Sequence, residues 1–122
     1  MTIKELYQSI GGDYEGALRV LRVEKLVDKH IRRFAENDAT ERLVIAGETM
    51  DPAELFEAAH AMKGVCANLG LTLLSYEASG ITEEFRPGNE RKLSDDEVRA
   101  RIYAIHEKYK STVEEIRKYE EG

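Results

Sequence analysis

One histidine in the sequence lies where a helix would present it to solvent. We set Leu55 at zero on a helical wheel and step about 100° per residue. The apolar residues that gather around Leu55 are Phe56, Ala58, Ala59, Met62, Val65, Cys66 and Leu69. His60 falls about 140° from this face, which predicts an outward imidazole. Gly64 and Ala67, at i+4 and i+7, share its strip of surface and carry no side chain that could cover the ring.

An open imidazole beside a lysine suits phosphoryl chemistry. Histidine side chains are largely unprotonated nucleophiles at neutral pH, because their ordinary pKa is about 6.5. Lys63, three residues after His60, brings an ammonium group close to anything bound to the ring. Phosphoryl transfer asks mainly for access and charge neutralisation. The pattern therefore predicts His60 as phosphoacceptor, Lys63 as electrostatic support and Gly64 as the residue that keeps the surface open.

A metal site is the sharpest competing interpretation of the same helix. Glu57 and His60 form Glu-x-x-His, an element that occurs twice in di-iron carboxylate bundles. Neither His30 nor His106 has a glutamate three residues before it, so the second copy is missing. Both side chains of the first copy also point away from the predicted core. We therefore expect no metal site.

Composition limits the classes of protein to which the chain can belong. Its 122 residues, 42% hydrophobic and 34% charged, fit a single domain over residues 1–122. The only cysteine, Cys66, excludes an internal disulfide and falls on the core face, where we expect a buried, inert thiol. A net charge of −6 without a basic patch disfavours nucleic acid and anionic membranes. With no signal peptide and no apolar run of membrane-spanning length, we expect a cytoplasmic protein.

Helical periodicity runs through the whole chain, and no strand pattern competes with it. Two short helices meet at Gly11-Gly12 and form an N-terminal appendage over residues 1–22. A longer helix follows over residues 23–47, with a bend expected at Asn37-Asp38. Asp51-Pro52 is a strong helix start signal for the histidine helix.

The remaining helices complete a bundle. Gly70 is suited to end the histidine helix, and the next apolar stripe stops at Arg86-Pro87. Ser94 opens a capping box for a last helix that runs almost to the C-terminus. Four long helices with short connections predict an all-α, antiparallel up-down-up-down four-helix bundle over residues 23–120, with the N-terminal helices covering one end.

The stretch from Ala58 to Gly70 resembles the signature of histidine-containing phosphotransfer (HPt) domains. Its central element is His-x-x-Lys-Gly, followed by a Leu-Gly helix end. The run Gly11-Gly12-Asp13-Tyr14 and the helix through Phe34 are also similar to what precedes that motif in the family. This chain has Ala61 and Met62 where the family often has a hydroxyl residue and a leucine.

The resemblance implies a function and its residues. It implies a four-helix bundle in which His60 is reversibly phosphorylated on Nε2, with Lys63 assisting and Gly64 keeping the surface open. The implied partners are receiver domains of response regulators and hybrid histidine kinases, which would carry the Mg²⁺, so the chain itself needs no cofactor. We expect them to dock on a patch of Ala53, Lys63, Gly64 and Ala67 around the histidine.

The sequence has no glycine-rich nucleotide-binding motif, so we expect no autokinase activity. The prediction is a free-standing, monomeric phosphorelay intermediate of two-component signal transduction. The alternative is a helical adaptor that binds a signalling partner without being phosphorylated.

Overall fold

The computed structural model describes residues 1–37 and 40–122, and its regular structure there is entirely helical. The helices in chain order are α1 (Ile3–Ser9), α2 (Tyr14–Leu21), α3 (Glu24–Glu36), α4 (Glu41–Thr49), α5 (Pro52–Asn68), α6 (Thr72–Phe85) and α7 (Asp95–Glu121). The all-α prediction is confirmed.

Side-chain caps explain where several of these helices begin. The Asp51 carboxylate accepts hydrogen bonds from the backbone N–H groups of Ala53 and Glu54, and Pro52 occupies the first helical position of α5. Ser94 and Glu97 form the reciprocal capping box expected at the start of α7. These local signals fix the starts of the helix that carries His60 and of the long C-terminal helix.

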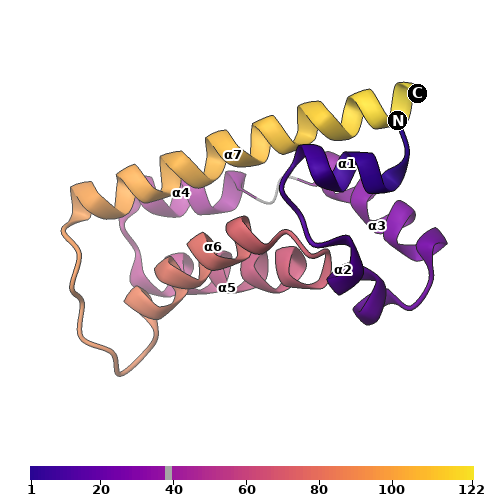
Figure 1. Ribbon diagram of the computed structural model, residues 1–122. Helices are drawn as coiled ribbons and strands as arrows, with labels where there is room; N and C mark the ends of the chain where they lie inside the picture. Colours follow the sequence, from indigo (N-terminus) through magenta and orange to yellow (C-terminus); the bar gives the residue numbers. More distant parts are fainter. Residues whose placement is uncertain (38–39) are drawn as a thin grey trace.

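The helices form a bundle whose first member is divided (Figure 1). α5 packs most extensively against α6, α4 packs between α5 and α7, and α3 lies along the second half of α7. α1 and α2 cover one end, where α1 contacts α7, and α2 contacts α3 and α5. α3 and α4 together therefore occupy the place expected for one long helix.

The single bent helix predicted over residues 23–47 is wrong in this respect. α3 ends at Glu36, and Asn37 is already extended, with φ −80° and ψ 139°. α4 begins only at Glu41, and Asp38, at which part of the bend was expected, lies outside the described residues. The apolar stripe continues across the break because both helices face the same core, so periodicity alone does not reveal it.

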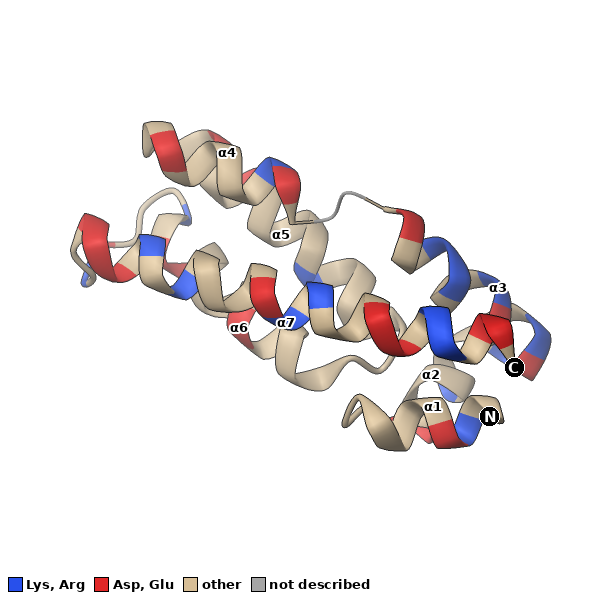
Figure 2. Ribbon diagram, turned by 90° about the horizontal axis from the view of Figure 1, so that it is seen from above, with Lys and Arg blue, Asp and Glu red and all other residues tan. Residues whose placement is uncertain are grey.

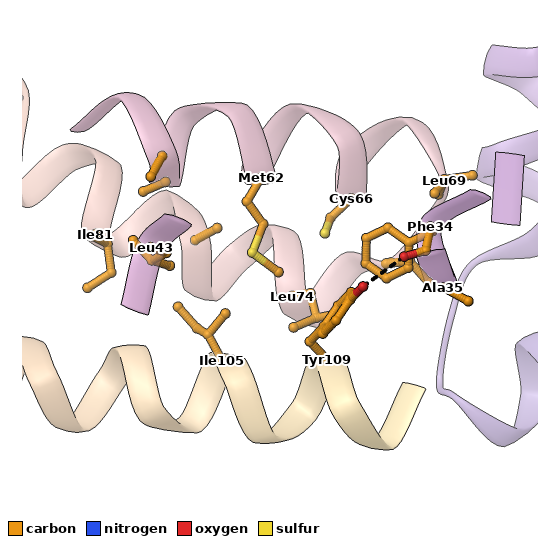
Figure 3. Close-up of a cluster of buried hydrophobic side chains, with 14 of the residues drawn as sticks. Phe34, Ala35, Leu43, Met62, Cys66, Leu69, Leu74, Ile81, Ile105 and Tyr109 are labelled. Atoms are coloured by element: carbon orange, nitrogen blue, oxygen red, sulfur yellow. Dashed lines mark hydrogen bonds between the residues drawn. The ribbon is translucent and has the colours of Figure 1, made fainter. Parts of the chain in front are cut away.

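The core runs the length of the bundle (Figure 3). Its central side chains are Phe34 of α3, Leu43 of α4, Met62 and Cys66 of α5, Leu74 and Ile81 of α6, and Ile105 and Tyr109 of α7. The Tyr109 hydroxyl donates to the backbone carbonyl of Phe34 at 3.0 Å and also to that of Asn37. This buried tyrosine thereby ties α7 to the end of α3, where the Phe34 carbonyl also accepts a backbone hydrogen bond from the Asn37 N–H at 3.3 Å.

Charged side chains lie mainly away from this core. Figure 2 shows α7 banded with both signs of charge along its length, whereas residues 64–76, at the end of α5 and the start of α6, carry none. Within the part of the chain that is described, no helix is both long enough and apolar enough to cross a membrane.

The turn between α5 and α6 is held against the N-terminal helices at Gly70. This residue has φ +69°, and its carbonyl accepts a hydrogen bond from the Asp13 N–H at 2.7 Å. The buried Tyr7 hydroxyl donates to the neighbouring Leu69 carbonyl at 2.7 Å, and burial raises the pKa of this hydroxyl. A Cβ atom on Gly70 would lie 2.1 Å from the Asp13 carbonyl oxygen. Only glycine fits this position.

Replacing Gly70 by alanine should therefore destabilise the fold strongly. We expect Gly70→Ala to lower the free energy of unfolding by about 2–4 kcal/mol, from left-handed backbone strain and steric overlap together. Gly88→Ala is the matched control, because Gly88 also has positive φ (+92°) but a Cβ there meets nothing within 4 Å. Urea unfolding followed by circular dichroism measures both. Equal losses would contradict the close approach at Gly70.

Cys66 should be unreactive in the folded protein. Its side chain is fully buried, and burial raises the pKa of the thiol to about 12, so very little thiolate exists at pH 8. We expect a water-soluble disulfide reagent at pH 8 to label Cys66 only at the rate at which the protein unfolds, and at once in guanidinium chloride. Rapid stoichiometric labelling without denaturant would show that this part of the core is open.

Candidate functional site

α5 has one buried face and one solvent-exposed face without large side chains, which we call its bare face. The two faces lie largely where the helical wheel predicts them. Its side chains on the inner face are Leu55, Ala58, Ala59, Met62, Cys66 and Leu69, all at most 3% exposed. The predicted site residues Ala53, His60, Gly64 and Ala67 are exposed, and Lys63 is half-buried at the edge towards α6. The structure therefore brings the predicted site residues together on one surface of one helix.

Val65 corrects the predicted core face. The helical wheel predicts Val65 on the core face, but 38% of this residue is exposed to solvent. It lines a groove of about 270 Å³ beside α3, together with His30, Arg33 and Asn68 among others. Val65 stands at the margin of the apolar arc, where residues of α2 and α3 line the groove beside it without covering it.

The imidazole of His60 stacks on a neighbouring aromatic ring. The ring centroids of Phe56 and His60 are 5.6 Å apart, and the two planes differ by 7°. The residues are four apart, so both lie on the same strip of α5. Phe56 is half-buried rather than a core residue, which leaves its ring available to His60. The stack restricts the orientations open to the imidazole while leaving its edge exposed.

Two charged residues complete this side of the site, Glu83 in the last turn of α6 and Arg86 directly after that helix. The Arg86 guanidinium lies 5.3 Å from the centroid of the Phe56 ring, a cation–π arrangement. Arg86 also forms an ion pair with Glu83, with Nη2 2.9 Å from Oε1 and Nε 3.0 Å from Oε2. The hydrogen bond from Arg86 lowers the pKa of the Glu83 carboxyl, and the charge of Lys63 acts in the same direction.

Sequence reasoning did not identify Phe56, Glu83 or Arg86 as site residues. The i, i+4 spacing of Phe56 and His60 was a usable signal for the stack. Arg86 was interpreted only as a helix end before Pro87, and nothing in the linear sequence joins it to a residue on another helix.

The opposite side of the site carries a second charged group. Arg42 of α4 forms ion pairs with Glu54 at 3.5 Å and with Glu57 at 3.1 Å. The Glu57 carboxylate of the Glu-x-x-His element is therefore engaged by a cation. Among residues 1–37 and 40–122, no group of three or more histidine, cysteine or acidic side chains is placed to hold a metal ion.

The other two histidines lie apart from α5's bare face. His106 is half-buried on α7, and its Nδ1 lies 2.7 Å from the hydroxyl oxygen of Thr40. His30 is half-buried on α3, at the groove beside Val65. Neither histidine is part of the surface that carries His60.

Gly64 has free space around it. A Cβ atom built on this residue would meet nothing within 4 Å, so the packing of the chain itself does not require a glycine. Glycine in a helix interior costs about 1 kcal/mol relative to alanine. A glycine at this position therefore loses stability without gaining any internal contact.

We expect Gly64→Ala to raise the free energy of unfolding by about 0.5–1 kcal/mol, because alanine restricts the unfolded chain and clashes with nothing. Gly47→Ala in α4 is the control, since its Cβ would lie 2.9 Å from Ile102 Cδ1 and must displace that side chain. Chemical denaturation of both variants measures the difference. A loss of stability in Gly64→Ala would mean that this surface is packed.

Comparison with known families agrees with this geometry. The family model described as Hpt domain matches residues 17–118. No curated protein and no solved structure matches the chain. The family match extends from α2 into the last turns of α7 and includes the whole of α5. The chain therefore belongs to the Hpt domain family, whose members have a phosphotransfer role in two-component signalling.

Proposed function

We propose that this protein is a phosphorelay intermediate that accepts a phosphoryl group on His60 from the aspartyl-phosphate of one receiver domain and passes it to another. The observation that carries the proposal is the imidazole itself, which is exposed on the bare face of α5 and stacked on Phe56. Lys63 one turn away and the open surface at Gly64 supply charge and access.

The transfer needs little from the protein beyond positioning. A lone pair on the neutral imidazole, on Nε2 by likeness to the family, attacks the phosphorus atom. The new N–P bond forms as the acyl P–O bond breaks, and the receiver's aspartate leaves as a carboxylate. The reverse reaction with a second receiver restores the free imidazole. The Lys63 ammonium offsets part of the charge of the phosphoryl group in both directions.

The surface around His60 suits a transient protein partner. Ala53 and Ala67 present small exposed side chains, Gly64 has none, and residues 64–76 carry no charge (Figure 2). Ion pairs flank this patch on both sides, from Arg42 on α4 and Arg86 on α6. A small apolar centre with a charged rim is the usual composition of a protein docking surface.

The cofactor and the cellular location follow from the same proposal. Mg²⁺ would be held by the receiver's acidic residues, because the receiver carries the aspartyl-phosphate. The protein would act as a monomer. It would act in the cytoplasm, where receivers of response regulators and hybrid kinases are found. It would not phosphorylate itself, since the sequence offers no motif to bind a nucleotide.

Phosphotransfer from a panel of radiolabelled phospho-receivers tests the proposal. We expect the native chain and a His30→Gln control to acquire acid-labile label within minutes, and His60→Gln to acquire none. The control removes a half-buried histidine of the same chain, so it tests whether the site is specific.

Acid-stable label, or equal label on His60→Gln, would contradict the proposal. Binding of a receiver equally well by His60→Gln, with no transfer to the native chain from receivers that phosphorylate another acceptor, would favour a non-phosphorylated adaptor.

A further inference from the structure

The Arg86 guanidinium lies against the same aromatic ring as His60 and is already paired with a carboxylate. Glu83 binds it through both carboxylate oxygens, at 2.9 Å from Nη2 and 3.0 Å from Nε. Asn89, in the loop after α6, donates from its side chain to the Glu83 carbonyl at 2.9 Å and to Glu83 Oε2 at 3.4 Å. The pair is therefore fixed at the C-terminal end of α6, where the helix stops before Pro87.

The pair is joined to the phosphoacceptor through one aromatic ring. Arg86 lies over Phe56, and Phe56 stacks on His60. The guanidinium and the imidazole therefore contact the same ring, at 5.3 and 5.6 Å from its centroid. Guanidinium groups bind phosphate oxygens in the same forked geometry in which they bind carboxylates. A phosphoryl group and the Glu83 carboxylate could therefore each bind the Arg86 guanidinium in the same way, and they would compete for it.

We propose that Glu83 is a positioning residue that limits how strongly the phosphoryl group is held on His60, by keeping Arg86 engaged over Phe56. The inference rests on the proposed function. The ion pair is exposed, with both side chains at least 40% accessible, so it is weak enough for a phosphoryl group of nearly two negative charges to compete for the arginine. By pairing with Arg86, Glu83 weakens the binding of Arg86 to the phosphoryl group. A phosphorelay intermediate needs this weakening, because the phosphoryl group must leave His60 as readily as it arrives.

The test uses a phosphorylated protein made without a partner. Phosphoramidate serves as donor: its P–N bond breaks and ammonia leaves as the N–P bond to His60 forms. The second ionisation of the phosphoryl group is then followed by phosphorus NMR as a function of pH. A cation that pairs with the phosphoryl group favours its dianion and moves the midpoint to lower pH. Altered packing alone would not shift this midpoint.

We expect Glu83→Gln to lower the midpoint by about 0.3 to 0.7 pH, and to shift the equilibrium with a phospho-receiver about two- to fivefold towards phospho-His60, the scale of surface charge interactions. Arg86→Gln should move neither quantity in that direction. In the Arg86→Gln background the effect of Glu83→Gln should disappear. Glu107→Gln is the matched control, because Glu107 forms an exposed i, i+3 pair with Lys110 on α7.

Two results would overturn the inference. Glu83→Gln could behave like Glu107→Gln, or its effect could persist without Arg86, which would assign it to the charge of Glu83 alone. Circular dichroism of all variants confirms that they are folded. If neither phosphoramidate nor any receiver labels His60, the proposed function itself fails, and this inference fails with it.

Discussion

The turn at Gly70 is the constraint on which the arrangement around α5 depends. The chain must reverse there to lay α6 against α5, and the same residue receives the N-terminal helices through its carbonyl group. The absence of a side chain allows the backbone of Asp13 to approach it. Gly70 therefore ends the helix that carries His60 and joins that helix to the segment between α1 and α2 at the end of the bundle.

Small residues allow α5 to be buried on one side and bare on the other. Ala58 and Ala59 face inward, and Ala78 of α6 is fully buried as well, so the two helices pack closely with little side-chain volume between them. On the outer side, Gly64 and Ala67 leave the neighbourhood of His60 flat. The inner small residues allow close packing, whereas the outer ones leave the imidazole uncovered.

Much of this arrangement could be predicted from the sequence, because it depends on local periodicity. The starts of α5 and α7, the glycine end of α5 and the outward position of His60 follow from caps and from the 3.6-residue repeat. The break between α3 and α4 could not be predicted, since a continuous apolar stripe does not require a continuous helix.

The environment of His60 could be predicted only in part. Lys63 and Gly64 are placed by the same helix and were found by spacing. Arg86 and Glu83 come from another helix, and their place beside Phe56 depends on how α5 and α6 pack. The exposure of Val65 could not be predicted for a related reason, because it depends on how α2 and α3 lie beside α5.

α7 packs against both α3 and α4, the two helices that replace the single long helix expected there. Its 27 residues lie against both α3, with 13 residues, and α4, with 9, and helices this short are marginal on their own. The positions of α3 and α4 relative to one another are therefore supported by the contacts that each of them makes with α7. α7 also holds the described residues on either side of the break, because Tyr109 donates to the Asn37 carbonyl and the buried Thr40 hydroxyl lies beside His106.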